Sequence, residues 1–313
     1  MGIPSRLLLF LGIGALAMGS CTSLDAPLPT ATAEALLRTT AVVASPPTPV
    51  AQPANAQATP TAGPTDAPLT AAEWKSWPIV PVVPPTVKQV FQKGQALGND
   101  PHAFSVFGDC QSVPDIFMGV YDTDRSKVAQ LPPALQETVA YFSGSFNRAS
   151  TTAQSDYTAA SLLNENMSLA QYGCNSNEIP VDCELRLHRP SFVFIMVGTH
   201  YERNNRNITY LRMILNDLLA HGVVPILETK ADSRGPDDNV DLDMAVLALE
   251  YNVPMWNFWA ATTGLPNHGL YTKADEEALG DIYLNDEALE LHRFTALESL
   301  DAVRSAVGDT LPQ

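Results

Sequence analysis

Three short, continuously apolar runs in the second half of this chain alternate with amphipathic segments, and this alternation constrains the fold most strongly. The runs are Ser191–Val197, Val223–Leu227 and Val253–Phe258, and each has the length of a strand buried on both faces. Between them, Ile208–His221 and Val240–Tyr251 carry apolar residues at helical spacing. This order predicts an α/β fold with three layers, in which helices cover both faces of a central parallel sheet.

The region before these runs predicts another strand and several helices. Pro85–Leu97 has the pattern of a short helix and leads into a strand over His102–Phe107. Pro132–Tyr141 has helical spacing, and Tyr157–Asn164 is a weaker helix candidate. A long final helix is expected to begin near Asn285, because Asn is a good N-cap and two acidic residues follow it, where the helix dipole favours them.

The N-terminal part of the chain predicts export. Residues 7–17 form an apolar run behind Arg6 that is too short to cross a bilayer, as in the core of a signal peptide. The following Met18-Gly19-Ser20-Cys21 resembles a lipobox, in which Cys21 becomes the lipidated N-terminus. In the alternative, this is an ordinary signal peptide and Cys21 is incidental. We therefore expect residues 1–21 to be a lipoprotein signal peptide and the protein to be a membrane-anchored, extracytoplasmic lipoprotein of a bacterial cell envelope.

Residues 22–84 form the second segment, which is rich in Pro, Thr and Ala. Its first part, residues 22–73, contains no aromatic residue, so the segment has little to bury and cannot offset the entropy of ordering. We expect a disordered tether over 22–84 and a folded domain over 85–313. After residue 85 the chain carries 15 basic and 30 acidic residues. Such a domain has no electrostatic footprint for nucleic acid, and it should meet a membrane only through a lipid anchor at Cys21.

The four cysteines have different expected roles. Cys174 and Cys183 lie nine residues apart in a loop-like stretch, and in an oxidising compartment they are expected to form a small-loop disulfide. Cys110 is left outside this pair. No Cys/His spacing suggests a zinc site, and no phosphate-binding Gly pattern is present, so we expect no metal and no cofactor.

The expected strand His102–Phe107 ends in Gly108-Asp109-Cys110, which places a thiol at the carboxyl end of the sheet, where ligands bind in open α/β folds. This stretch resembles the GDS block of the SGNH (GDSL-type) hydrolases, with Cys110 in place of the nucleophilic Ser. The order of elements over about residues 100–308 is similar to that family too. The resemblance implies a flavodoxin-like fold and hydrolysis of acyl esters, here by a degenerate member.

The other blocks of that family match this sequence weakly. The resemblance places Asp156 or Ser155 where the family has the Gly that donates to the oxyanion. It places Gly198 in the third block, with His200 at the position of the Asn. In the last block, Tyr283 takes the position of the catalytic His. Alternatively His292, two turns into the final helix, is the base.

Two functional interpretations lead at this stage, and a third, a purely structural envelope protein, is also open. A Cys nucleophile near an imidazole readily becomes a thiolate, which favours a Cys110–His200 dyad or, in a second version, Cys110–His292, acting on small-molecule or carbohydrate esters. Asp109 is expected to hold the nucleophile turn, and Trp256 to offer a sugar-stacking surface. The alternative is an inactive protein that binds a glycan or another surface ligand, with Cys110, His292 and Trp256 as packing residues.

Overall fold

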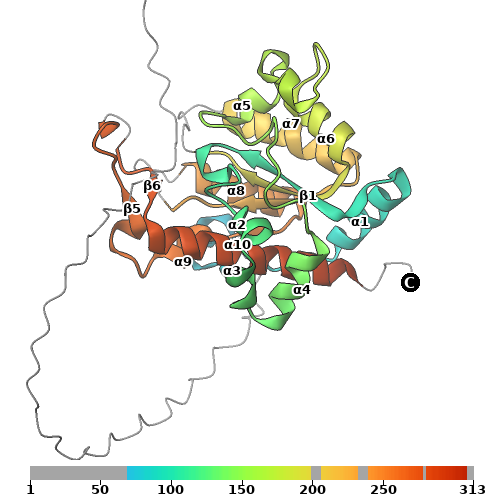
Figure 1. Cartoon of the computed structure of the whole chain (residues 1–313). Coiled ribbons are helices and arrows are strands. Elements are labelled where there is room, and N and C mark those ends of the chain that lie inside the picture. Colours follow the sequence, from blue (N-terminus) through green and yellow to red (C-terminus); the bar gives the residue numbers. More distant parts are fainter. Residues whose placement is uncertain (1–68, 199–205, 232–238, 278–279, 309–313) are drawn as a thin grey trace, which may run out of the picture. The chain divides into compact units, whose positions relative to one another are not determined.

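A four-stranded parallel sheet in the order β1-β2-β3-β4 lies at the centre of the fold (Figure 1). The computed structural model describes residues 69–198, 206–231, 239–277 and 280–308. The strands are β1 (Asp100–Gly108), β2 (Pro190–Met196), β3 (Val224–Glu228) and β4 (Met255–Trp256). All seven side chains of β2 are buried, as the apolar run predicts for a strand covered on both faces.

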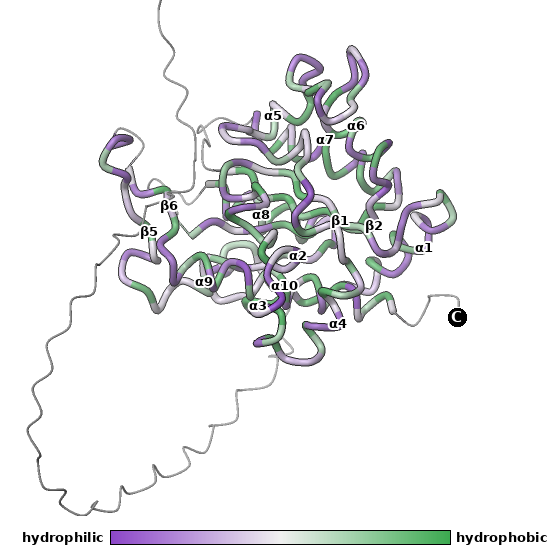
Figure 2. The backbone as a smooth tube through the Cα atoms, in the orientation of Figure 1, coloured by the Kyte–Doolittle hydropathy of each residue, from purple (hydrophilic) through white to green (hydrophobic). Residues whose placement is uncertain are grey.

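Successive side chains of each strand point to opposite faces of the sheet, and each face has its own apolar cluster. On one face, Phe104, Phe194 and Ile226 belong to the cluster that includes helices α1 (Thr86–Leu97), α4 (Pro133–Tyr141) and α10 (Asp286–Val307). The opposite face has α5 (Ala159–Leu162), α6 (Pro180–His188), α7 (Arg206–Ala220) and α8 (Asn239–Tyr251). In Figure 2 the centre of the fold is hydrophobic and the outer loops are largely hydrophilic. The expected three-layer α/β/α fold is confirmed.

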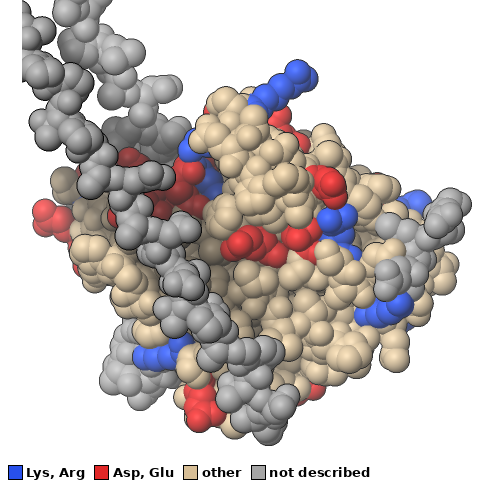
Figure 3. Space-filling view, turned by 90° about the horizontal axis from the view of Figure 1, so that it is seen from below, with Lys and Arg blue, Asp and Glu red and all other residues tan. Residues whose placement is uncertain are grey.

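The remaining elements are short. Helices α2 (Val120–Thr123), α3 (Arg125–Ala129) and α9 (Phe258–Thr262) and an antiparallel pair, β5 (Leu270–Tyr271) with β6 (Tyr283–Leu284), complete the regular structure. The 3-10 helices are η1 (Ala71–Ser76), η2 (Cys110–Ser112), η3 (Glu165–Met167), η4 (Ala170–Tyr172) and η5 (Pro266–Gly269). None of the described helices has the length and apolar character needed to cross a membrane. On the face in Figure 3, Lys and Arg side chains are scattered and form no continuous stripe.

The third apolar run is a much shorter strand than its sequence predicts. Only Met255 and Trp256 pair with β3. The chain then turns into α9, because the side chain of Asn257 accepts a hydrogen bond from the backbone of Ala260 at 3.2 Å and caps that helix. The same side chain donates to the carbonyl oxygens of Trp74 and Trp77. An apolar run alone does not show where such a capping residue ends a strand.

The segment just before α1 is packed onto the domain. Trp74 and Trp77 are buried in the same apolar cluster as α7 and α8, and the ring of Trp74 meets the Trp259 ring edge-on at 5.3 Å. The domain therefore begins near residue 69, and the expected tether boundary at residue 84 is wrong. Two large aromatic side chains supply enough apolar surface to order these residues. Residues 1–68, with Cys21, lie outside the described residues.

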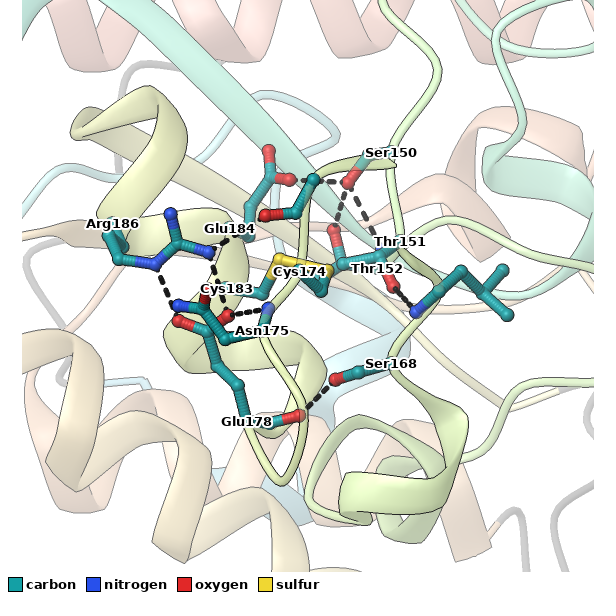
Figure 4. Close-up of a disulfide and its surroundings, with 12 residues drawn as sticks. Ser150, Thr151, Thr152, Ser168, Cys174, Asn175, Glu178, Cys183, Glu184 and Arg186 are labelled. Atoms are coloured by element: carbon teal, nitrogen blue, oxygen red, sulfur yellow. Dashed lines mark hydrogen bonds and ion pairs between the residues drawn. A yellow bond between two sulfur atoms is a disulfide. The ribbon is translucent and has the colours of Figure 1, made fainter. Parts of the chain in front are cut away.

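The predicted disulfide joins Cys174 to Cys183, the latter in α6 (Figure 4). The next residue, Glu184, is a buried carboxylate that accepts hydrogen bonds from Ser105 and Ser150, both at 2.6 Å, and pairs with Arg148 at 2.7 Å. Among the described residues, a group of possible metal-ligating side chains comprises Cys174, Glu178 and Cys183. Its two sulfur atoms are joined to each other, so they are not thiolate ligands in this form.

Candidate functional site

The turn after β1 is built on a close approach of backbone segments. A side chain at Gly108 would place its first carbon 2.7 Å from Cβ and Oγ of Ser112 and 3.0 Å from Cβ of Met196, so only glycine fits this position. The Gly108 N–H donates to the carbonyl of Thr152 at 2.9 Å, which ties the strand end to the neighbouring loop. The chain then enters η2, which begins at Cys110.

Asp109 holds this turn, as the sequence predicts. Its Oδ1 accepts from the Gln111 N–H and its Oδ2 from the Gly198 N–H, both at 3.1 Å, so that one carboxylate connects the ends of β1 and β2. The side chain is fully buried. A buried carboxylate requires a counter-charge, and the Lys230 ammonium provides it at 3.2 Å from Oδ2.

Lys230 reaches Asp109 from two residues beyond β3. Its ammonium also lies 3.4 Å from Oε1 of Gln111 and 3.9 Å from Oε2 of Glu228, and its backbone N–H donates to Asp241 in α8. Burial opposes the charged form of the amine, but the charges of Asp109, Glu228 and Cys110 favour it. The pKa of Lys230 therefore lies above its ordinary value. Lys230 is thus a buried cation at the carboxyl end of the sheet.

Glu228 connects Lys230 to the final helix. Its Oε1 lies 2.6 Å from Nε2 of His292, and both side chains are fully buried. The imidazole is surrounded by the rings of Phe117, Trp256 and Phe258, whose centroids lie between 4.4 and 5.0 Å away. His292 Nδ1 has no hydrogen-bond partner among the residues that the structure describes. The site thus comprises a charge chain, meaning the row of buried ionisable side chains from His292 through Glu228 and Lys230 to Asp109.

Cys110 lies in this site. Of the two histidines proposed from the sequence as its base, the structure describes His292 but not His200. The thiol is 5% exposed, is outside the disulfide, and interacts electrostatically with Lys230. His200 lies outside the described residues, so its place beside Cys110 stays a prediction. His292 is not arranged as the base of Cys110, because its Nε2 faces Glu228 and its Nδ1 makes no hydrogen bond to any described residue. Its alternative role as a buried residue fits the structure better.

The structure corrects two of the four expected binding residues. The Gly198 N–H donates to Asp109 and is therefore not directed at a substrate oxyanion. Trp256 is fully buried and donates to Thr295 at 3.0 Å, so it offers no ring face to a sugar. Asp156 is exposed and has a positive φ of 65°. Tyr283 is buried, pairs with Tyr271 and has the Lys273 ammonium 4.0 Å from its ring centre.

Sequence reasoning did not single out Gln111, Glu228 or Lys230. Gln111 fixes the turn by donating to the carbonyl of Ile282 at 2.9 Å. The positions of Glu228 and Lys230 could have predicted a role in the site. Charged residues directly at the end of an otherwise apolar strand are expected to be buried and therefore to need partners of opposite charge.

Comparisons with known proteins add little to this picture. Neither a protein-family model nor a curated protein matches the chain. Among solved structures, the chain is similar to the crystal structure of a GDSL-like lipase from Bacteroides thetaiotaomicron, with 14% sequence identity and a TM-score of 0.36. The match covers 72% of this chain and 99% of that chain. Fold and site together describe an α/β/α protein with a thiol and a buried lysine at the carboxyl end of its parallel sheet.

Proposed function

We propose that this protein is an SGNH-type hydrolase of acyl esters in which Cys110 replaces the usual serine as the nucleophile. The observation that carries the proposal is the Lys230 ammonium at the Cys110 turn, because the interaction that favours the charged amine equally favours the thiolate. A thiolate at the carboxyl end of a parallel sheet is placed where substrates of such folds bind. Esters of surface carbohydrate are the substrate class to examine first.

The reaction would proceed in two steps. The Cys110 thiolate attacks the ester carbonyl carbon, the carbon–oxygen bond to the alcohol breaks, and the leaving alkoxide takes a proton from water. This leaves a thioester on Cys110. Water then attacks the thioester, the carbon–sulfur bond breaks, and the acid and the thiolate are released. The proton lost in this step combines with the hydroxide left when the alkoxide was protonated, so one water is consumed overall.

The test is hydrolysis of acetyl esters, including acetylated polysaccharide, by the full chain. Cys110→Ala should abolish turnover, and mass spectrometry of the wild type during turnover should find one acyl group on the peptide that contains Cys110. His102→Gln is a matched control, since His102 contacts Tyr141 away from the charge chain. Turnover that survives Cys110→Ala, with no acyl adduct, would exclude the proposed mechanism.

A second candidate is a catalytically inactive protein that binds a glycan or another surface ligand. This function is favoured by the burial of the ionisable side chains at the site, which leaves them inaccessible to a substrate. Each is no more than 2% exposed, and they are Asp109, Glu228, Lys230 and His292. In that case Cys110 is a packing residue and the ion pairs stabilise the fold. Saturable binding to cell-surface polysaccharide that is unchanged by Cys110→Ala, without ester hydrolysis, would select this function.

We also propose that the chain is exported and anchored through a lipid on Cys21. The composition of residues 7–21 and the disulfide between Cys174 and Cys183 support an oxidising compartment. Expression of the full chain in a bacterium should place it in the membrane fraction, and Cys21→Ser should release it. Equal distribution of both forms would contradict the lipid anchor.

A further inference from the structure

We propose that Glu228 and His292 form a positioning pair that sets how strongly the Lys230 ammonium favours the thiolate of Cys110. The inference rests on the proposed function in one respect only, namely that Cys110 is the reactive group. Its test reads the ionisation of the Cys110 thiol and does not depend on ester hydrolysis. The contact that carries the inference is the 2.6 Å approach of His292 Nε2 to Glu228, with both side chains fully buried.

The register of β3 explains this placement. Ile226 points into the apolar cluster that includes α10, and Glu228, two residues later, points to the same face of the sheet. There it meets His292, which α10 presents between aromatic rings. Among the described residues, Glu228 is the polar partner of the imidazole, and Phe117, Trp256 and Phe258 supply the ring contacts around it. A charge on His292 would therefore act on the site through Glu228.

The other oxygen of Glu228 faces Lys230. Oε2 lies 3.9 Å from the ammonium and has no hydrogen-bond partner within the described part of the chain. Glu228 therefore lies between two basic groups, and a carboxylate neutralised by a protonated His292 attracts the Lys230 ammonium less strongly. The ammonium is correspondingly more effective at favouring the negative charge on Cys110.

The charges around Lys230 show why such a pair is needed. Asp109 faces the ammonium from the turn after β1 and Glu228 from the end of β3, while Asp241 of α8 accepts the backbone N–H of Lys230 at 2.7 Å. Two buried carboxylates thus face the buried ammonium and a third binds the backbone of the same residue, so a thiolate on Cys110 would add a further negative charge. Excess negative charge in a buried site is unfavourable, and a proton on His292 would offset part of it.

This arrangement predicts effects of opposite sign for two substitutions. Glu228→Gln removes a carboxylate that competes with Cys110 for the ammonium, so the titration midpoint of the Cys110 thiol should fall, by about one pH unit for a charge at this range. His292→Gln leaves Lys230 as the basic group that faces Glu228, so this carboxylate competes more strongly with Cys110 for the ammonium and the midpoint should rise by a similar amount. In the double variant the His292 substitution should have no further effect, because His292 acts through Glu228.

The measurement is the ultraviolet absorbance of the thiolate as a function of pH, taken on the full chain. For each variant, the spectrum of its counterpart with the additional substitution Cys110→Ala is subtracted. This difference removes the absorbance of Cys21 and of the tyrosines. Absorbance does not require a reagent to reach the buried sulfur. His221→Gln is the matched control, because His221 is exposed and pairs with Asp217. This substitution should leave the midpoint unchanged. Circular dichroism reports whether each variant is folded.

Opposite shifts with a non-additive double variant would support the pair. Unchanged midpoints, shifts in the same direction, or additive effects would overturn it. If Glu228→Gln or His292→Gln does not fold, Glu228→Asp, which keeps the charge on a shorter side chain, and His292→Asn, which also removes the imidazole, carry the same test. The shift should keep its sign in each case and be smaller for Glu228→Asp. A protein with these shifts and no esterase activity would retain the inference while the proposed function fails.

Discussion

The Lys230 ammonium lies 3.2 Å from the carboxylate of Asp109, the residue before Cys110, although the two are 121 positions apart in the chain. This contact joins the ends of β1 and β3 across the end of β2. Gly198, at the end of β2, leaves room for it, because a side chain there would come within 3.2 Å of the Lys230 side chain. The buried ion pair therefore packs closely against a glycine that follows the strand between its partners.

Removing the ammonium should destabilise the fold strongly. Lys230→Met leaves the buried carboxylates of Asp109 and Glu228 without their cation, and breaking such a pair costs about 3–5 kcal/mol. The free energy of unfolding from urea titration at neutral pH measures the loss. Lys127→Met is the matched control, since the pair of Lys127 with Glu290 is exposed and contributes about 1 kcal/mol or less. Equal losses in the two variants would mean that the buried pair carries no special weight.

Gly108 should not tolerate even one added carbon. Gly108→Ala forces its new methyl group to within 2.7 Å of the Ser112 side chain and 3.0 Å of Met196, and overpacking of this kind costs roughly 1–3 kcal/mol. The loss is measured as a lower denaturation midpoint. Gly264→Ala serves as the comparison because its added carbon meets no atom within 4 Å. Similar midpoints for the two variants would argue against the close approach at Gly108.

The layers of this fold could be predicted from the sequence because they follow from hydrophobic period alone. The run Ser191–Val197 and the helical stripe of Ile208–His221 are local patterns, and β2 and α7 lie within a few residues of the expected bounds. The burial of Trp74 and Trp77 could not be predicted in this way, because it depends on Asn257, which binds their carbonyl oxygens from 180 residues away or more.

The candidate site was predictable only in part for the same reason. Gly108, Asp109 and Cys110 are adjacent in the chain, so a single turn brings them together. Their charge partner Lys230 arrives from another strand, and His292 from the last helix. A residue pattern does not specify which buried cation will face which buried carboxylate, because that depends on strand order and on the direction of each side chain.

The ion pair that fixes the disulfide loop should give the fold an acid-sensitive contribution. The Arg186 side chain and the backbone of Asn175 both donate to Glu178 and lower its pKa to about 2. A carboxyl whose folded-state pKa lies below its unfolded value stabilises the fold above the unfolded value and loses this effect as pH falls. Glu178→Gln should therefore be less stable than the wild type near neutral pH, and the two should converge as pH falls through about 4 toward 2. A difference that is constant with pH would contradict this.

Glu184 and the neighbouring disulfide should contribute to the stability of the nucleophile turn in different ways. The carboxylate of Glu184 orients Ser105 of β1 and Ser150, and Ser150 lies 2.8 Å from Thr152, the residue whose carbonyl accepts the Gly108 N–H (Figure 4). Glu184→Ala leaves the Arg148 guanidinium without its buried partner, at a cost of about 3–5 kcal/mol, and should also increase hydrogen exchange at the Gly108 amide.

Replacing both Cys174 and Cys183 with Ser acts mainly on the unfolded chain, because the bridge closes a short loop. We expect a loss of roughly 2–3 kcal/mol in the free energy of unfolding, without faster exchange at Gly108 in the folded state. Hydrogen exchange followed by mass spectrometry of the peptide around Gly108 separates the two effects. Because Glu184 accepts a hydrogen bond from Ser105 of β1, equal exchange in the two variants would show that the Glu184 network does not hold the turn.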